Sequence, residues 1–236
     1  MTDHEERVTS YGVYTLEKFC NLYPGEFTLP RDTSVISVTD NKVTVYCGDV
    51  KISTFSIIYS ENQERFVYHG EFSGWLPYMD VARSTFFKMV DCVNYVNLKF
   101  HYGRLRCEDG PAKEILFSDG VKQVEWFDNH ERHRKNGPAI KMWHPNGKTG
   151  LKKYLREGYY YRKDGPAVQE WYDNGQLKKE IWYKDYEENG CYICAAKHRE
   201  DGLPAYTKWN EEGNIIEQKW FYRGKEQPYI TTKKAL

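Results

Sequence analysis

The sequence predicts a mainly β protein: an antiparallel β-hairpin repeat array, of meander or solenoid type, with a small amino-terminal α+β domain. Three observations predict this class. One pattern recurs four times in the carboxy-terminal half, Asn-Gly and Asp-Gly pairs separate stretches of alternating residues, and aromatic residues make up 16% of the 236 residues. Aromatic side chains favour strands and broad, flat contact surfaces.

The repeats align on a proline. The four segments read LRCEDGPAKEILFSDG, RHRKNGPAIKMWHPNG, YYRKDGPAVQEWYDNG and KHREDGLPAYTKWNEEG. The anchoring residues are Pro111, Pro138, Pro166 and Pro204, which are 27, 28 and 38 residues apart. A fixed period of this length is typical of repeat architectures. The long third step predicts an insertion, which we place in the stretch KDYEENGCYICAA after Trp182.

Each unit carries three landmarks at fixed spacing. A glycine follows the proline by nine residues, at Gly120, Gly147, Gly175 and Gly213. A large residue follows the proline by five, at Leu116, Trp143, Trp171 and Trp209, and an aromatic follows the glycine by seven, at Phe127, Tyr154, Trp182 and Trp220. Asn or Asp before glycine predicts a two-residue hairpin turn, because both positions tolerate positive φ. A second turn is expected near Gly103, His130, Gly158 and Gly224, so each unit has two strands and two turns.

The strand alternation predicts which side chains share a face. Trp143, Trp171 and Trp209 are expected in register on one face, with Glu170 exposed on the other. The tryptophan row has two interpretations. It is either the core of the array, covered by the amino-terminal domain or by side-chain stems, or a binding surface for a partner, since Trp, Tyr and Arg dominate binding hot spots.

An arginine precedes the glycine of the DGPA element by three residues. The arginines are Arg134, Arg162 and Arg199, and we expect them to bridge to an acidic or carbonyl group of a neighbouring unit. The first unit has Cys107 at this position, and the fourth has Leu203 inserted before Pro204. End repeats are often atypical because they cap the stack.

Residues 1–97 lack the repeat pattern. A short helix is expected at Thr15–Tyr23, followed by strands at 35–38, 42–47, 52–59 and 65–69 and a second helix at Asp80–Val93. We therefore predict three parts: an α+β cap domain over 1–97, four β-repeats over 98–230 and a frayed tail over 231–236.

The repeats resemble the MORN-variant family, in its version with an HR-x-DGPA core and a following W-Y-x-NG. The resemblance covers residues 98–228 and does not extend to residues 1–97. Proteins with this variant are abundant in large DNA viruses, in bacteriophages and in some bacteria, and several bacterial relatives carry an antitoxin label. The resemblance implies a hairpin array that binds or scaffolds, and it implies no catalytic residues.

We therefore expect a non-catalytic repeat scaffold or protein-interaction module, acting as a structural or assembly protein of a large DNA virus or phage. An antitoxin-like or host-directed regulatory binding protein is the alternative, and an enzyme housed in residues 1–97 is a third hypothesis. The expected partners are other proteins, with Trp143, Trp171, Trp209 and the three repeat arginines on the binding face. The 34 basic and 34 acidic side chains argue against a dominant nucleic-acid role.

No cofactor is expected. No apolar run approaches the roughly 20 residues of a membrane span, and the polar amino terminus lacks a secretion signal, so we expect a cytoplasmic protein, in a host cytoplasm or virion. The sequence contains one candidate metal site. Cys191, Cys194 and His198 could supply three zinc ligands, but a fourth is not evident, and packed thiols in an inserted strand or loop are the alternative.

Overall fold

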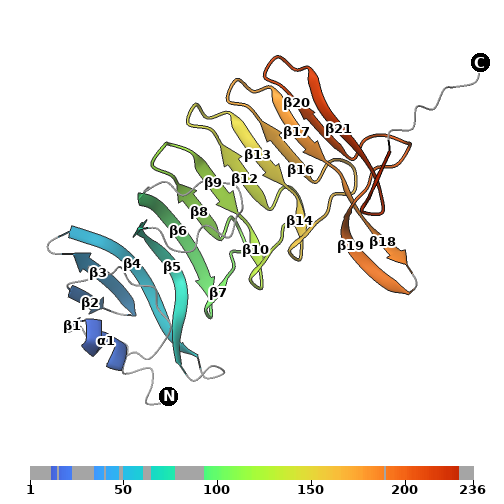
Figure 1. The fold of residues 1–236 in the computed structure, drawn as a ribbon. Coiled ribbons are helices and arrows are strands. Elements are labelled where there is room, and N and C mark those ends of the chain that lie inside the picture. The colour runs from blue at the N-terminus through green and yellow to red at the C-terminus, as the bar shows by residue number, and fades with distance from the viewer. Residues whose placement is uncertain are drawn as a thin grey trace, which may run out of the picture. The chain divides into compact units, whose positions relative to one another are not determined.

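The computed structural model describes residues 12–14, 16–22, 35–39, 41–47, 50–60, 65–77, 93–188 and 190–228. The chain divides into two compact units, Met1–Gly120 (unit 1) and Val121–Leu236 (unit 2). In both units antiparallel strands follow one another in hairpin order, which confirms the predicted mainly β class (Figure 1). Within each unit, the described strands run from one edge strand to another and do not close into a ring.

Unit 1 contains the predicted strands of the amino-terminal part. Its elements are β1 (Gly12–Tyr14), α1 (Leu16–Leu22), β2 (Val35–Thr39), β3 (Lys42–Cys47), β4 (Val50–Ser60), β5 (Arg65–Pro77), β6 (Val93–His101), β7 (Arg104–Leu105) and β8 (Lys113–Leu116). The helix expected at Thr15–Tyr23 is α1, and the four expected strands are β2 to β5. The helix expected at Asp80–Val93 lies outside the described residues up to Val93, where β6 begins.

The core of unit 1 lies on one face of this sheet. Ile36 and Val38 of β2 are fully buried while their neighbours in the strand are not, as the two-residue period of a strand requires. Phe19 of α1 is also fully buried and joins the same apolar cluster. The cluster consists of Phe19, Ile36, Val38, Val43, Val45, Phe55, Ile57, Phe66, Phe72, Val96 and Ile115.

The two compact units divide after Gly120, whereas the sequence pattern predicts a change after residue 97. Strand pairing explains the difference. β8, the first strand of the first repeat, pairs antiparallel with β6, with Leu116 opposite Tyr95 and Lys113 opposite Leu98. The first repeat therefore begins as part of the sheet of unit 1.

Unit 2 contains the second strand of the first repeat and the three repeats that follow. Its elements are β9 (Lys122–Glu125), β10 (Phe127–Asp128), β11 (Glu131–Arg132), β12 (Ile140–Trp143), β13 (Thr149–Lys153), β14 (Leu155–Arg156), β15 (Tyr159–Tyr160), β16 (Val168–Trp171), β17 (Leu177–Ile181), β18 (Tyr183–Glu188), β19 (Cys191–Lys197), β20 (Tyr206–Trp209), β21 (Ile215–Tyr222) and β22 (Lys225–Gln227). The hairpin β18–β19 is the insertion predicted after Trp182, and it forms a two-stranded sheet of its own.

The turn at the Asn-Gly positions differs from the prediction. In the β12–β13 turn only Gly147 has positive φ, and its amide donates to the His144 carbonyl at 2.9 Å. Beyond the turn Gly150 is bulged out of β13, because Met142 pairs with Leu151 and Trp143 with Thr149. The loop itself has three residues, since the His144 amide donates to the Lys148 carbonyl at 2.9 Å. This is a type I turn followed by a left-handed glycine, which is the usual three-residue hairpin loop, and not the two-residue turn.

The second turn of each unit is where two consecutive residues have positive φ. Glu157 and Gly158 have φ of 51° and 79°, and Arg223 and Gly224 have 47° and 81°. Two consecutive left-handed residues are the requirement of the type I′ hairpin turn. The predicted second turn is confirmed at these positions.

Candidate functional site

The three repeat tryptophans occupy equivalent positions in unit 2. Trp143, Trp171 and Trp209 end β12, β16 and β20, and each side chain is half-buried. Lysines lie beside the first two rings. The ammonium of Lys141 is 4.3 Å from the ring centre of Trp143, and that of Lys152 is 5.3 Å from the ring centre of Trp171. We call this side of the sheet the tryptophan face.

The tryptophan face is cationic as well as aromatic. Burial, and then the nearby charges of Lys152 and Arg134, lower the pKa of Lys141 below its usual value. Adjacent cations beside half-buried rings are the side-chain chemistry of many binding hot spots.

The core of unit 2 lies on the opposite face, and the predicted exposure of Glu170 is wrong. Val168 and Glu170 of β16 are 3% and 7% exposed. Glu170 is buried because its carboxylate pairs with the Lys179 ammonium of β17 at 2.7 Å. The alternation of side chains along the strand was therefore predicted correctly, but the face that carries Glu170 is the buried one.

A second buried carboxylate lies further along the same inner face. Glu125 of β9 is 1% exposed, and its Oε2 atom is 2.6 Å from Nε of Arg132. Its Oε1 atom accepts a hydrogen bond of 2.8 Å from Gln123. A buried charge is tolerated only when it is paired and hydrogen-bonded, so these contacts fix where the hairpin β10–β11 lies on the sheet.

The repeat arginines pack on aromatic rings. The guanidinium carbons of Arg134, Arg162 and Arg199 lie 3.8, 4.1 and 4.1 Å from the ring centres of Trp126, Tyr154 and Trp182, respectively. Each ring belongs to the unit that precedes the arginine. The arginines therefore join neighbouring repeats, but through a ring and not through the acidic or carbonyl group that we expected.

The carbonyl partner of each arginine is in its own repeat. Nη1 of Arg162 donates to the Pro166 carbonyl at 3.1 Å, and Arg134 and Arg199 make the same contact with their own prolines at 3.3 and 3.4 Å. The glycine of the DGPA element makes room for the guanidinium. A Cβ atom at Gly165 would lie 2.8 Å from Cζ of Arg162.

The aromatic landmark of the first unit is Trp126 and not Phe127. The amides of Trp126, Tyr154 and Trp182 donate to the carbonyls of Ala139, Ala167 and Ala205, respectively, each at 2.8 Å. These three alanines are 0% exposed. Each alanine therefore occupies the space beside a ring that carries an arginine, which accounts for the small residue in DGPA.

Side chains in the first turn connect successive repeats. Nε2 of His144 is hydrogen-bonded to the Trp171 carbonyl at 2.9 Å, and the hydroxyl of Tyr172 donates to the Trp209 carbonyl at 2.9 Å. Asn146 donates to the carbonyl of Asp173 at 2.7 Å. The residue that follows Trp143 and the residue that follows Trp171 therefore each form a hydrogen bond to the next repeat, although the first is a histidine and the second a tyrosine.

Histidines connect the second turns in the same way. Nδ1 of His198 accepts a hydrogen bond from the Arg223 amide at 3.3 Å, and Nδ1 of His133 accepts one from the Glu157 amide at 3.2 Å. Both donors are the first left-handed residue of a type I′ turn. An imidazole can accept at Nδ1 only while that nitrogen is unprotonated.

Acidification is therefore expected to destabilise unit 2 through His198. Burial, and then the charge of Lys184, lower its pKa below 6.5, with Glu200 opposing and Arg223 assisting. The unfolded chain then takes up this proton at higher pH than the folded protein. The contribution of neutral His198 to the free energy of unfolding is complete above about pH 7, and it is lost as the pH falls from there towards the lowered pKa. The measurement is the urea midpoint of the full chain at several pH values.

The control for this prediction is His198→Gln, because a glutamine oxygen accepts the Arg223 amide without titrating. We expect this variant to unfold with a shallower pH dependence than the wild type below about pH 7. Equal pH dependence in the two proteins would show that His198 does not carry the effect.

The proposed zinc ligands are only partly described, because the side chain of Cys191 lies outside the described residues. Within the described ranges, no three His, Cys, Asp or Glu side chains are placed to hold a metal ion together. Cys194 is a free thiol. Nδ1 of His198 already serves as the acceptor described above.

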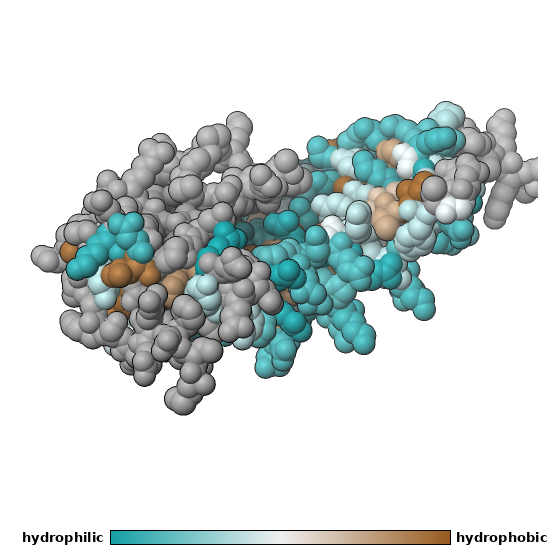
Figure 2. Space-filling model, turned by 90° about the horizontal axis from the view of Figure 1, so that it is seen from below, coloured by the Kyte–Doolittle hydropathy of each residue, from teal (hydrophilic) through white to brown (hydrophobic). Residues whose placement is uncertain are grey.

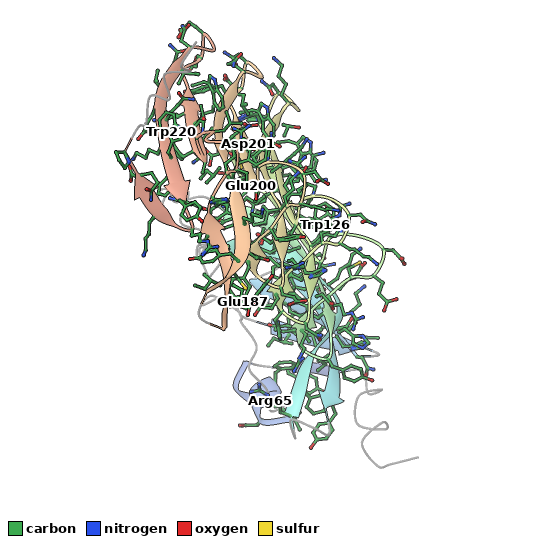
Figure 3. All side chains as sticks on the ribbon, turned by 90° about the vertical axis from the view of Figure 1, so that its right-hand side faces the viewer. Arg65, Trp126, Glu187, Glu200, Asp201 and Trp220 are labelled. Carbon is green, nitrogen blue, oxygen red and sulfur yellow. The ribbon has the colours of Figure 1, made fainter. Side chains whose placement is uncertain are left out.

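Two grooves of about 550 and 520 Å³ meet at the fourth repeat of unit 2. Seven residues line both of them: Lys184, Asp185, His198, Arg199, Glu200, Asp201 and Leu203. The larger groove continues along the last hairpin, past Trp220 and Arg223, and the smaller continues towards the third repeat, past Arg162 and Trp182. Figure 3 shows Glu200, Asp201 and Trp220 in this part of unit 2. The inserted Leu203 marks this place in the sequence, although the sequence pattern does not predict a groove.

The surface of unit 2 is mixed in character. Over unit 2, the face seen in Figure 2 is mainly hydrophilic, with a smaller pale and brown area towards the carboxy-terminal end. The exposed large apolar side chains of the later repeats are Tyr192, Leu203, Ile215, Ile216 and Tyr222. Exposed groups of this kind beside polar ones are typical of interaction surfaces.

Comparison with known proteins gives no family for the chain. No protein-family model matches it, and a search of curated proteins finds no match. In the described part of the chain, no helix is long and apolar enough to span a membrane.

Proposed function

We propose that this chain is a non-catalytic protein-interaction module that binds a partner through the tryptophan face of unit 2. The observation that carries the proposal is the row of half-buried rings at Trp143, Trp171 and Trp209, with Lys141 and Lys152 against the first two. Neighbouring strands are about 4.8 Å apart, so tryptophans on alternate strands recur about every 10 Å. A regular row of this kind matches an extended partner surface.

The charged residues of unit 2 support a binding role over a catalytic one. Glu125 and Glu170 are held by Arg132 and Lys179, and the repeat arginines by rings and carbonyls. These groups maintain the fold. A catalytic site needs titratable groups that converge on a substrate with unequal pKa values.

The resemblance to MORN-variant repeats supports a structural or assembly role in a large DNA virus or phage. Under this proposal the tryptophan face is covered by another protein of the assembly. An antitoxin-like or host-directed regulator is the second candidate, since it uses the same face to cap a single partner.

Charge reversal on the tryptophan face tests the proposal. We expect Lys141→Glu combined with Lys152→Glu to weaken capture of the partner from the native source by at least about tenfold, because hot-spot contacts are concentrated. The captured protein is identified by mass spectrometry and its affinity is then measured with purified components. Lys135→Glu combined with Lys225→Glu is the control, since both lysines are exposed and belong to none of the strands that carry Lys141, Lys152 and the three tryptophans.

The outcomes separate the candidates. Co-purification with particles or a large complex supports the assembly role. A one-to-one complex with a protein that is toxic when expressed alone supports the regulatory role. Equal capture by the wild type and the tryptophan-face variant, with folding intact, would refute the use of this face.

A further inference from the structure

We propose that the two grooves at the fourth repeat form a binding site for an extended acidic segment of a partner protein. The inference deepens the proposed function, on which it rests, by stating the chemistry of the segment that unit 2 recognises. It assigns a role to the two irregular features of the array, the inserted Leu203 and the hairpin β18–β19.

The grooves exist because the fourth repeat departs from the pattern. In the third repeat Arg162 bonds the proline carbonyl four residues later, whereas in the fourth Arg199 bonds the carbonyl five residues later, at Pro204. The extra residue is Leu203, which is 44% exposed and lines both grooves. The inserted hairpin supplies one wall through Lys184 and Asp185.

The charge of the site favours an acidic ligand, although the chain as a whole is neutral. Six basic and three acidic side chains line the two grooves. Two of the acids are already paired, Asp185 with Arg156 at 2.8 Å and Glu200 with Lys184. The remaining charged side chains of the lining are Arg162, Lys163, Arg199, Arg223 and Asp201. Four cations against one anion attract a carboxylate-rich segment.

Asp185 adds little repulsion to such a segment because its oxygens are satisfied within unit 2. Oδ2 accepts hydrogen bonds from Arg156 and from the Tyr192 hydroxyl at 2.8 and 2.9 Å, and Oδ1 accepts one from the Ala195 amide at 2.9 Å. The inserted hairpin thus uses its own acid to hold Arg156 and Tyr192 at the wall of the smaller groove.

One buried donor in the wall has no acceptor. Nε1 of Trp182 is buried without a hydrogen-bond partner among the described residues, and Trp182 lines the smaller groove. By contrast, Nε1 of Trp220, in the larger groove, donates to the Gly202 carbonyl at 3.0 Å. The Trp182 donor is shielded from the groove, so Trp182 contributes to the site through its ring and not through this nitrogen.

Two rings of the grooves are already covered by arginines, whereas Tyr192 and Tyr222 are exposed, so the apolar contact at Leu203 is what favours a peptide over a single-stranded nucleic acid. Nucleic acids without sequence preference bind by stacking bases on aromatic faces. In this site the ring of Trp182 is packed under Arg199, and the ring of Tyr161 under Arg156, at 4.1 and 3.8 Å. Leu203 instead offers an apolar contact, and an extended peptide presents alternate side chains to such contacts.

The test uses a fluorescent peptide of about 12 residues that alternates glutamate and leucine, the length of an extended recognition segment. Its lysine–leucine counterpart and an oligothymidylate of similar length are the comparison probes. The full chain is compared with two variants, Lys163→Glu and deletion of Leu203. The deletion restores the DGPA spacing of the other repeats, so it is expected to preserve the fold while it removes the groove.

We expect the acidic peptide to bind the wild type and to bind each variant at least about tenfold more weakly, as loss of a hot-spot contact predicts. The matched control is Lys135→Glu, which occupies the position of Lys163 one repeat earlier and is exposed outside the grooves. It should bind within about twofold of the wild type, as rim or remote charges do.

The proposal fails if the acidic peptide does not bind at about 1 mM, a free energy near 4 kcal/mol. It also fails if deletion of Leu203 leaves the affinity unchanged, or if the oligothymidylate binds more tightly than the peptide. Such failures leave the proposed function standing if charge reversal on the tryptophan face still abolishes partner capture. If capture is instead insensitive to that face, the proposed function fails independently of the peptide result.

Discussion

Replacing Arg132 with leucine is expected to destabilise unit 2 by about 3 kcal/mol, because it removes the cation that is hydrogen-bonded to a buried carboxylate. Glu125 is 1% exposed, and Arg132 lies 2.6 Å from it with a third of its own side chain exposed. Glu125→Leu removes the buried charge and leaves an arginine that reaches water, so it should cost less. The double replacement should be close to the wild type, since an apolar pair of similar size often replaces a buried ion pair at little cost.

Urea unfolding followed by tryptophan fluorescence measures these differences. Six of the seven tryptophans of the chain lie in unit 2, so the signal reports mainly on that unit. Lys219→Leu is the control. Its partner is Glu217, and the two side chains are 42% and 38% exposed, so this change should cost much less than the change at Arg132. A loss at Arg132 no larger than at Lys219, or a larger loss at Glu125, would contradict the role of the buried charge.

Enlarging Ala167 to leucine is expected to cost about 2 to 3 kcal/mol by overpacking. Ala167 is 0% exposed. The next residue, Val168, pairs with Lys153 on one side and Ile181 on the other, so Tyr154 and Trp182 flank Ala167. Each of these rings is already covered by an arginine. A leucine at this position must displace a ring or a guanidinium.

The matched control for Ala167 is Thr149→Leu. Thr149 is half-buried in the same array, and the equivalent positions in the next repeats hold Leu177 and Ile215, each paired with the tryptophan of its own repeat. A larger side chain is tolerated at this position, so the free energy of unfolding of Thr149→Leu should lie within about 0.5 kcal/mol of the wild-type value. Both variants are measured by the same urea unfolding. An equal effect at the two positions would show that the alanine is not confined by the stacked rings.

The hairpin array was predictable because its signals are local. A chain reversal is expected at each Asn-Gly pair of the first turn and at each second turn of the Glu157–Gly158 type. Between the turns, successive side chains of a strand point to opposite faces of the sheet. The turn geometry was only partly predictable. A left-handed glycine after a type I turn and a two-residue turn use the same Asn-Gly pair, and only the hydrogen bond from the His144 amide to the Lys148 carbonyl in the paired sheet distinguishes them.

The roles of the candidate binding residues were less predictable. Trp143 and Arg134 belong to one repeat, but Trp143 remains half-buried on an open face while Arg134 packs on Trp126 and bonds its own proline carbonyl. The spacing in the sequence shows that residues recur, but it does not show which of the recurring residues contact or hydrogen-bond one another.

By itself, the sequence determined that this protein is an antiparallel hairpin array with a distinct amino-terminal part, because turn chemistry and two-residue alternation act over a few neighbouring residues. Only the tertiary structure decided which face is the core, because Glu170 and Glu125 are buried through cations on other strands. The tertiary structure also decided that the irregular fourth repeat forms a groove, because Leu203, the inserted hairpin and the last hairpin meet there. Pairing between distant residues governs burial, and a linear pattern does not encode that pairing.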